Sequence, residues 1–399
     1  MCVTLASPRD DFQTNSFPLL KDLRLNDIDT RLDRLRGPDE PTKHNARTIA
    51  ALTNNPGCTR RRVLDAAAID KKALAEAAGF PGPFGASPFA LARGKVFEAQ
   101  VKANGCAELL RLLRERYGLS IPEVSYDDLN SVGGHESLAA RHRRTLQLLG
   151  RAAGSGEDAG TLFDHPLLTM EIGGRTVYLE PDLVAFRLLG RFHIVEIKSF
   201  PVIDRVADPA KVAAAAMQSA VYVLALRHAL KGLGFDPAVV SHEVFLVCPE
   251  DFSNRPTATR VDVRKQLTVL LRQLDRLAEL PPIVAALPQE LSFDLRRDSA
   301  GVVTRSAEEL LQGLGHIEAR YAPECLSTCD LAYLCRASAA GRTEALGRST
   351  QEDLGGIETV ASVLALADGS TEPGEHEVES ARLLRNAERL RRECLGGAA

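Results

Sequence analysis

Apolar and polar positions alternate along the chain with two different periods, which together predict interleaved strands and helices. Apolar runs of strand length, rich in β-branched residues, predict strands near residues 167–172, 175–186, 191–199 and 242–248. Apolar residues at helical spacing predict helices over residues 90–117, 135–152, 209–232 and 262–279. Strands that alternate with helices are typical of the α/β class.

The segments around this middle region differ from it in composition. The first part of the chain is polar and carries Pro and Asp, which predicts an extended or partly ordered arm. The last part predicts short helices separated by turns, and Pro/Gly-rich stretches at 80–89 and 150–160 predict loops. We therefore divide the chain into an arm, a main domain and a helical C-terminal module, at residues 1–45, 46–340 and 341–399.

The stretch PDLVAFRLLGRFHIVEIK, residues 181–198, has the strongest chemical signal of the chain. Pro181 favours an extended entry for Asp182 into a strand. Glu196 and Lys198 are two residues apart on an apolar strand, so they point to the same face. A hairpin between these strands brings Asp182 beside them. An E-x-K pair is also common on the solvent face of a surface hairpin, but this strand is too apolar for an exposed edge.

Two carboxylates and a lysine at a strand edge suit the hydrolysis of phosphodiesters. Mg²⁺ and Mn²⁺ take oxygen ligands, usually one or two carboxylates together with water and substrate phosphate. We predict that Asp182 and Glu196 bind such an ion, with the carbonyl of Ile197 as a further ligand. The ion would lower the pKa of a bound water, and Lys198 would orient that water.

The predicted helix 209–232 adds Gln218 and Tyr222 to the candidate site. These residues are four apart and share one helix face. Because the helix follows the E-x-K strand, both side chains can face the predicted metal ion. The alternative is a core tyrosine with a neighbouring glutamine and no role in chemistry.

Cysteine supplies a second signal. Three of the eight cysteines, Cys325, Cys329 and Cys335, lie within PECLSTCDLAYLCR. Thiolates this close together can share one metal centre but are poorly placed for disulfides. Three such ligands leave a fourth to be supplied from elsewhere. The local spacing does not distinguish iron–sulfur from zinc.

These motifs resemble those of the PD-(D/E)XK nuclease superfamily, and within it the RecB-like exonucleases. Gln218-Ser-Ala-Val-Tyr222 matches the Q-x-x-x-Y motif of that group, whose helix helps to bind DNA and to position the active site. Gly94-Lys-Val-Phe-Glu98 matches the upstream G-x-x-x-[HE] motif, at which many relatives carry His instead of Glu98. The resemblance implies that Glu98 binds metal or holds a metal-bound water.

The cysteines extend the resemblance to the stand-alone, CRISPR-associated type of iron–sulfur RecB-like nuclease. Those relatives take a fourth cysteine from ahead of the G-x-x-x-[HE] helix, where this chain has Cys58. The resemblance implies a [4Fe–4S] cluster on Cys58 and the three late cysteines, with zinc as the alternative. The spacing here is C-x3-C-x5-C, whereas C-x2-C-x5-C is more common. Such a cluster would join the two ends of the 46–340 domain.

The resemblance implies both a specific fold and a specific activity. The fold is a restriction-endonuclease-like α/β core, with a central mixed sheet flanked by helices and helical additions at both ends. The activity is metal-dependent cleavage of DNA, first of all as a single-stranded DNA exonuclease in repair or phage defence. A structure- or site-specific endonuclease is one alternative. A non-catalytic DNA-end-binding subunit that recruits a helicase is another, although such a subunit does not need an intact Asp-Glu-Lys set.

Composition limits these expectations. The net charge is −4, so a phosphate-binding surface must be local rather than general. Its candidates are the basic runs 60–62, 71–72 and 141–144, each of which would also suit a solvated helix face. No apolar run reaches 18 residues, no signal-peptide pattern opens the chain, and no P-loop occurs. We therefore expect a cytoplasmic protein without a membrane partner and without an ATP-driven motor of its own.

Overall fold

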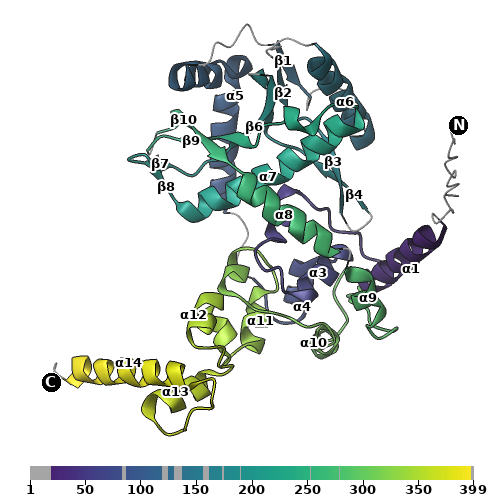
Figure 1. Ribbon diagram of the computed structural model, residues 1–399. Helices are drawn as coiled ribbons and strands as arrows, with labels where there is room; N and C mark the ends of the chain where they lie inside the picture. The colour runs from purple at the N-terminus through teal and green to yellow at the C-terminus, as the bar shows by residue number, and fades with distance from the viewer. Residues whose placement is uncertain are drawn as a thin grey trace, which may run out of the picture.

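The computed structural model has a mixed α/β architecture, which confirms the α/β class. It describes residues 19–82, 87–118, 125–129, 137–155, 161–172, 175–188, 190–251, 253–277 and 279–396. Residues 1–18 of the predicted arm, with Cys2, lie outside the described residues, as do parts of the predicted loops 80–89 and 150–160. Figure 1 shows a sheet-containing body and, below it, a body made of short helices.

Six strands form one mixed sheet, and four more form two small hairpins. The strands are β1 (Ser125–Asp128), β2 (Thr161–Asp164), β3 (Leu168–Ile172), β4 (Arg175–Leu179), β5 (Leu183–Leu188), β6 (Arg191–Ile197), β7 (Val202–Ile203), β8 (Val206–Ala207), β9 (Glu243–Pro249) and β10 (Pro256–Asp262). The sheet order is β1-β2-β5-β6-β9-β10. β1 and β2 run parallel, as do β6 and β9, while the other neighbours in this sheet are antiparallel.

Helices make up most of the remaining described chain. They are α1 (Leu19–Arg36), α2 (Ala46–Ala51), α3 (Thr59–Ala66), α4 (Lys71–Ala77), α5 (Pro88–Tyr117), α6 (Leu138–Gly154), α7 (Pro209–Gly232), α8 (Arg264–Leu277), α9 (Leu280–Ala285), α10 (Ala307–Gly315), α11 (Ala332–Ser338), α12 (Arg348–Asp353), α13 (Val360–Asp368) and α14 (Val378–Gly396). In Figure 1, α7 and α8 cross in front of the sheet and α5 lies behind it.

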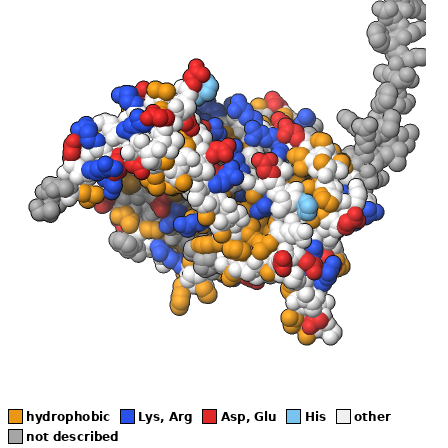
Figure 2. All heavy atoms as spheres, turned by 90° about the horizontal axis from the view of Figure 1, so that it is seen from below, with side chains coloured by type: hydrophobic (Ala, Val, Ile, Leu, Met, Phe, Trp, Pro, Cys, Tyr) orange, Lys and Arg blue, Asp and Glu red, His pale blue; other side chains and the backbone are white. Residues whose placement is uncertain are grey.

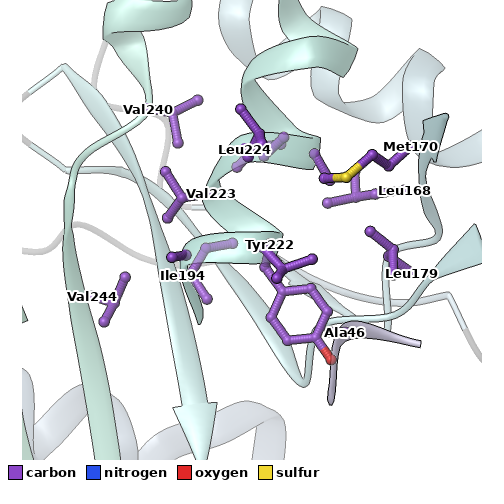
Figure 3. Close-up of a cluster of buried hydrophobic side chains, with 14 of the residues drawn as sticks. Ala46, Leu168, Met170, Leu179, Ile194, Tyr222, Val223, Leu224, Val240 and Val244 are labelled. Atoms are coloured by element: carbon purple, nitrogen blue, oxygen red, sulfur yellow. The ribbon is translucent and has the colours of Figure 1, made fainter. Parts of the chain in front are cut away.

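Strand β6 shows how the sequence forms an apolar core on both faces of the sheet. Phe192 and Ile194 join the cluster on the α7 side, whereas Val195 and Ile197 join the cluster against α5. Successive side chains of a strand point to opposite faces, so a strand that is apolar throughout needs cover on both. Figure 3 shows the α7 side, where Tyr222 and its neighbours on the helix lie among the buried strand residues.

Helix α7 is a core helix, and its span matches the predicted helix 209–232. Asp208 caps its first turn, because the carboxylate accepts hydrogen bonds from the backbone N–H groups of Ala210 and Lys211. By length and composition the helix could cross a membrane, but 56% of its most apolar window is buried inside the protein. It packs on β3 and β6 and against α2 and α8. Its apolar character is therefore accounted for by the core it covers.

The predicted strand 175–186 is two strands that belong to different sheets. β4 ends at Leu179, β5 begins at Leu183, and Pro181 lies between them. Proline lacks the amide hydrogen that a strand ladder needs, so the break falls there. Strands β1, β2 and β10 were not predicted. β1 and β2 are only four residues long, and β10 is largely polar on its exposed half.

The predicted helix 90–117 is interrupted. The backbone of α5 leaves the helical region from Ala103 to Cys106, and Asn104, Gly105 and Cys106 have positive φ. Glycine and asparagine adopt this region at low cost, and Cys106 is held there with a fully buried side chain. The break separates the half of α5 that carries Glu98 from the half that ends the helix.

The helical body has an apolar core of its own. Side chains from α1, α3, α4, α9, α10 and α11 form one buried cluster that includes Cys325 and Cys335. The prediction of an extended or partly ordered arm is wrong for Leu19–Arg36, which is a helix with buried Leu32 and Leu35. Ile28, Leu32 and Leu35 recur at helical spacing and pack against the helical body, but the charged residues between them concealed this period.

The last two helices form a separate pair. α13 and α14 pack on each other around a small cluster of Ile357, Leu366 and Ala381. In Figure 1 this pair lies at the far end of the helical body from the sheet. Residues 341–396 are thus largely helical, as their pattern of short apolar segments and turns predicted.

Candidate metal centre and cysteine cluster

The hairpin of β5 and β6 brings the three predicted catalytic side chains together. Asp182 immediately precedes β5, and its neighbour Leu183 lies opposite Val195 in the antiparallel pair. Asp182 Oδ2 accepts a hydrogen bond from the backbone N–H of Ile197 at 2.8 Å. Glu196 follows Val195 on β6, and its Oε1 forms an ion pair with Lys198 Nζ.

Glu196 has the most unusual environment of these residues. Its side chain is 0% exposed, whereas glutamate is seldom fully buried unless it is paired. Apart from the ion pair with Lys198, neither carboxylate oxygen has a hydrogen-bond partner among the described residues. Burying a carboxylate in this way costs free energy unless a cation binds it. The donor set therefore fits a hard divalent cation, which prefers carboxylate oxygen.

Burial and mutual charge shift the pKa values of all three groups upward. Burial, strengthened by the charge of Asp182, raises the pKa of Glu196 to about 8. Burial also raises the pKa of Asp182, against the opposing charge of Lys198. For Lys198 burial acts in the other direction, but the charges of Glu196 and Asp182 overcome it and raise the lysine pKa. Lys198 therefore stays protonated beside the carboxylates.

Gln218 and Tyr222 share one face of α7. Gln218 Nε2 donates a hydrogen bond to the Tyr222 hydroxyl at 3.2 Å. In Figure 3 the Tyr222 ring extends away from the helix, with the hydroxyl oxygen at its far end. Burial and the charge of Glu196 raise the tyrosine pKa above its usual range. The hydroxyl is therefore protonated and able to donate a hydrogen bond near the acidic site.

Glu98 belongs to a second charged network on the α5 side of the sheet. Lys102, one turn later on α5, places its Nζ 2.5 Å from Glu98 Oε1 and 2.7 Å from Asp164 Oδ1. His165 closes the network, with Nδ1 2.7 Å from Asp164 Oδ1 and Nε2 3.3 Å from Glu98 Oε1. The Tyr126 hydroxyl donates to the other oxygen of Asp164. Two carboxylates here share one buried ammonium and one imidazole.

This second network adjoins the first. The backbone N–H of His165 donates to the carbonyl of Asp182 at 3.3 Å. The charge of Glu98 also contributes to the raised pKa values of both Asp182 and Glu196. The structure therefore places Glu98, on helix α5, within electrostatic reach of the predicted metal ligands of the β5–β6 hairpin.

Hydrogen bonds inside the second network favour its charged forms. A hydrogen bond from His165 is the largest contribution that lowers the pKa of Glu98, to about 2. Burial would raise the pKa of Asp164, but hydrogen bonds from His165 and Lys102 lower it to about 2. The same bonds raise the pKa of His165 to about 9. These carboxylates are therefore ionised at neutral pH.

Sequence reasoning missed Lys102, Asp164 and His165. Lys102 lies four residues after Glu98, a helical spacing that could have signalled an ion pair. Asp164 ends β2 and His165 follows it, and this four-residue strand was too short to be predicted. Oxygen and nitrogen atoms of Asp128, Asp164 and His165 also lie within 4.8 Å of one another. Nothing in the local sequence connects these residues to the helix that carries Glu98.

The four cysteines of the predicted cluster all lie in the helical body. Cys58 immediately precedes α3, Cys325 lies in the 3₁₀ turn Pro323–Ser327, and Cys335 lies on α11. Burial raises the pKa of Cys335, and the charges of Cys58 and Cys325 raise it further, which places these three thiols near one another. Burial also raises the pKa of Cys329, to about 12. All seven described cysteines are free thiols.

Two buried polar side chains point at these sulfur atoms. Asn55 Nδ2 donates to Cys325 Sγ at 3.2 Å, and Arg60 donates to Cys335 Sγ at 3.6 Å. Arg60 also donates to the backbone carbonyls of Leu314 and Ile317. Hydrogen bonds to sulfur stabilise thiolates and tune iron–sulfur centres. The surroundings of the cysteines therefore fit metal-bound thiolate.

The remaining described cysteines are not part of this group. Burial raises the pKa of Cys106 and of Cys248 to about 12, as it does for Cys329, so their location and not their pKa separates them from the group. Cys106 packs against α5 and the sheet, and Cys248 lies on β9. Cys394 is exposed on α14.

Two of the three predicted basic runs are largely structural. Arg60 and Arg61 are only 9% and 5% exposed, and Arg61 donates to the backbone carbonyl of Thr328 and pairs with Asp65. Lys71 also pairs with Asp65. The expectation that Arg60 and Arg61 contact DNA phosphates is therefore wrong, because their guanidinium groups are used inside the helical body.

The third basic run lies beside the acidic site. Arg141 on α6 pairs with Glu180 at 2.6 Å and donates to the carbonyl of His165. Arg143 and Arg144 are exposed and stay candidates for phosphate contacts. Figure 2 views the molecule from below and shows acidic and basic side chains interspersed on that face. That face has no extended surface of one charge among the described residues.

Comparison with known proteins adds little to this geometry. No protein-family model and no curated protein matches the chain. Among solved structures, the chain has a likeness to the one titled "Crystal structure of SSO0001", with 13% identity and a TM-score of 0.25. The likeness covers 68% of this chain and 89% of the other. At this level it supports no inference about fold or function.

Proposed function

We propose that this protein is a divalent-metal-dependent deoxyribonuclease of the RecB-like PD-(D/E)XK type. The observation that carries the proposal is the fully buried carboxylate of Glu196, which has no hydrogen bond beyond its ion pair with Lys198 and lies beside Asp182. Two desolvated like charges destabilise a fold. Two buried carboxylates that share a single lysine are typical of a functional site rather than of a structural one.

Each residue of the site has a role in the proposed reaction. Asp182 and Glu196, with the carbonyl of Ile197, would hold Mg²⁺ or Mn²⁺. A bound ion supplies an activated water and stabilises charge on the phosphate. Lys198 stays charged next to Glu196 and can orient the water or a phosphate oxygen. Tyr222, kept protonated and buried, can donate a hydrogen bond inside the site.

We propose that Cys58, Cys325, Cys329 and Cys335 hold a [4Fe–4S] cluster. The donors to Cys325 and Cys335 sulfur support bound thiolate. No three of these sulfurs lie within 4.8 Å of one another, whereas a single tetrahedral zinc with Zn–S of about 2.3 Å needs them about 3.8 Å apart. A cluster spreads its thiolates over several irons and suits the wider spacing. Its role would be to join α3 to the segment around α11.

The preferred substrate is single-stranded DNA degraded from an end. This choice follows the family resemblance, and Arg143 and Arg144, exposed on the helix whose Arg141 pairs with Glu180, support a local track for phosphate. The free thiols of the described cysteines support a reducing compartment such as the cytoplasm. A helicase is the partner that would supply such strands, since no P-loop occurs in this chain.

A cleavage assay with end-labelled DNA tests the proposal. We expect Mg²⁺- or Mn²⁺-dependent release of nucleotides from linear single strands, and loss of that activity in Asp182→Ala and Lys198→Ala. Lys231→Ala, at an exposed position in the last turn of α7, is the matched control and should behave as wild type. Metal-dependent cleavage that persists in both site variants would rule the proposal out.

Comparing linear with circular single-stranded DNA distinguishes an exonuclease from an endonuclease. A circular single strand has no end, so an exonuclease leaves it intact while it degrades the linear form. Cutting of the circle would identify an endonuclease instead. Binding to DNA ends without cleavage in either metal would support a non-catalytic end-binding subunit.

A further inference from the structure

Lys102 places a cation in the middle of the second charged network. Its Nζ lies 2.5 Å from Glu98 Oε1 and 2.7 Å from Asp164 Oδ1, and its side chain is only 9% exposed. His165 completes the group, with ring nitrogens 2.7 Å from Asp164 Oδ1 and 3.3 Å from Glu98 Oε1. The ammonium group therefore occupies a position among carboxylates that a metal ion would otherwise take.

The carboxylates of the two networks differ in how far their charge is already neutralised. Glu98 and Asp164 share the Lys102 ammonium and both lie against His165. Glu196 has only its ion pair with Lys198, and its oxygens lack hydrogen bonds among the described residues. The capacity to bind an added cation is therefore concentrated on the β5–β6 hairpin and not on α5.

The two networks are close enough that the charges of one affect a cation bound at the other. The backbone of His165 bonds to that of Asp182, and the charge of Lys102 acts on Asp182 directly. Enzymes that use two metal ions hold them about 3.5–4 Å apart, between shared ligands. The ammonium group of Lys102, held by Glu98 and Asp164, repels a second divalent ion and also takes up the ligands that would bind it.

We propose that Lys102 is a resident cation that replaces a second metal ion, so that the centre holds a single Mg²⁺ or Mn²⁺ at Asp182 and Glu196. This inference rests on the proposed function and refines it. Glu98 is then a positioning residue that holds Lys102, rather than a direct metal ligand. A lysine gives the site a positive charge that cannot dissociate, independent of metal concentration.

Titration of the metal-free, full-length chain with Mn²⁺ tests the inference, with bound ions counted by calorimetry and by the electron paramagnetic resonance of free Mn²⁺. Wild type should bind one Mn²⁺ per chain at this centre, and Asp182→Ala should bind none. Lys102→Met and Lys102→Gln should bind two, because Glu98 and Asp164 are then released. Lys102→Arg, which keeps the charge, should bind one.

Lys95→Met is the matched control, because Lys95 is exposed on the same helix, and it should bind one ion. Two ions in wild type, or one ion in both folded neutral variants of Lys102, would overturn the inference and leave the proposed function intact. One ion that persists in Asp182→Ala would also overturn it, since the ion would lie elsewhere. No bound Mn²⁺ in wild type would overturn the proposed function and the inference together. Circular dichroism identifies which variants are folded.

Discussion

The acidic site and the cysteine site differ in how their polar atoms are satisfied. Glu196 lies in the sheet core without hydrogen-bond donors beyond its ion pair with Lys198. Cys325 and Cys335 instead accept hydrogen bonds from the buried side chains of Asn55 and Arg60. The first site therefore costs the fold free energy, while the second joins distant segments and contributes to stability. This contrast agrees with the proposed roles, chemistry at the acidic site and structural support at the cysteine site.

The largest expected effect separates activity from stability at Glu196. Glu196→Gln removes a predicted metal ligand, so DNA cleavage should fall by about 10³-fold or more. The metal-free variant should melt at a higher temperature than metal-free wild type, because a desolvated charge next to Asp182 is gone. Cleavage rates and thermal melts in EDTA measure the two effects. A lower melting temperature would contradict the contrast between the sites.

Substitution at the cysteine site should lower the stability of the protein, in contrast to substitution of Glu196. Cys335→Ser should lose the bound iron and destabilise the protein by about 3 kcal/mol or more, because the joined segments are released. Iron content, the visible absorption of the anaerobically purified protein and chemical unfolding measure this. The exposed Cys394→Ser is the matched control and should keep both iron and stability. A colourless wild type that contains zinc would show that the cofactor assignment is wrong.

A smaller effect is expected in the pH dependence of the metal-free protein. The folded-state pKa of Glu196 is about 8, above its ordinary value of 4.5. Between these pH values the folded state keeps a proton that the unfolded state releases, so stability falls as the pH rises. Melting temperatures in EDTA at pH 5 and pH 8 should show this decrease. The dependence should be clearly weaker in Glu196→Gln, and an equal slope in both proteins would contradict the assignment.

The smallest effect is expected at the exposed arginines of α6. Arg143→Gln and Arg144→Gln should each weaken single-stranded DNA binding about threefold and reduce the salt slope by about 0.7. Titrations of labelled DNA at several salt concentrations measure both quantities. Lys231→Gln, exposed at the far end of α7, should leave binding unchanged. Equal losses at all three positions would show that the α6 arginines form no specific track.

Much of the fold followed from local patterns, and the exceptions have physical causes. The span of α7 and the positions of β6 and β9 agree with their predicted ranges, because long apolar segments need burial wherever they occur. α1 was missed because charged residues separate Ile28, Leu32 and Leu35, the apolar positions that pack against the helical body. The short strands β1 and β2 form only because their neighbours in the sheet pair with them.

Some residues of the candidate site could likewise be predicted from local patterns, and others could not. Asp182, Glu196 and Lys198 could be found from the sequence, because a proline, a strand period of two and a hairpin bring them together within one short stretch. Gln218 and Tyr222 could be paired by helical spacing. The burial of Arg60 and Arg61 next to Cys58 could not be predicted from the sequence. Whether an arginine faces solvent or donates to a backbone carbonyl depends on which segments pack over it.

The sequence by itself determined which side chains meet on the β5–β6 hairpin. Residues so near one another along the chain can be arranged in only a few ways. Only the tertiary structure decided what surrounds that hairpin. It joined Glu98 and Lys102 of α5 to Asp164 and His165 at the end of β2, and it buried Arg60 against Cys335. Those contacts link residues far apart in the chain, and which of them form is set by how the helices cover the sheet and each other.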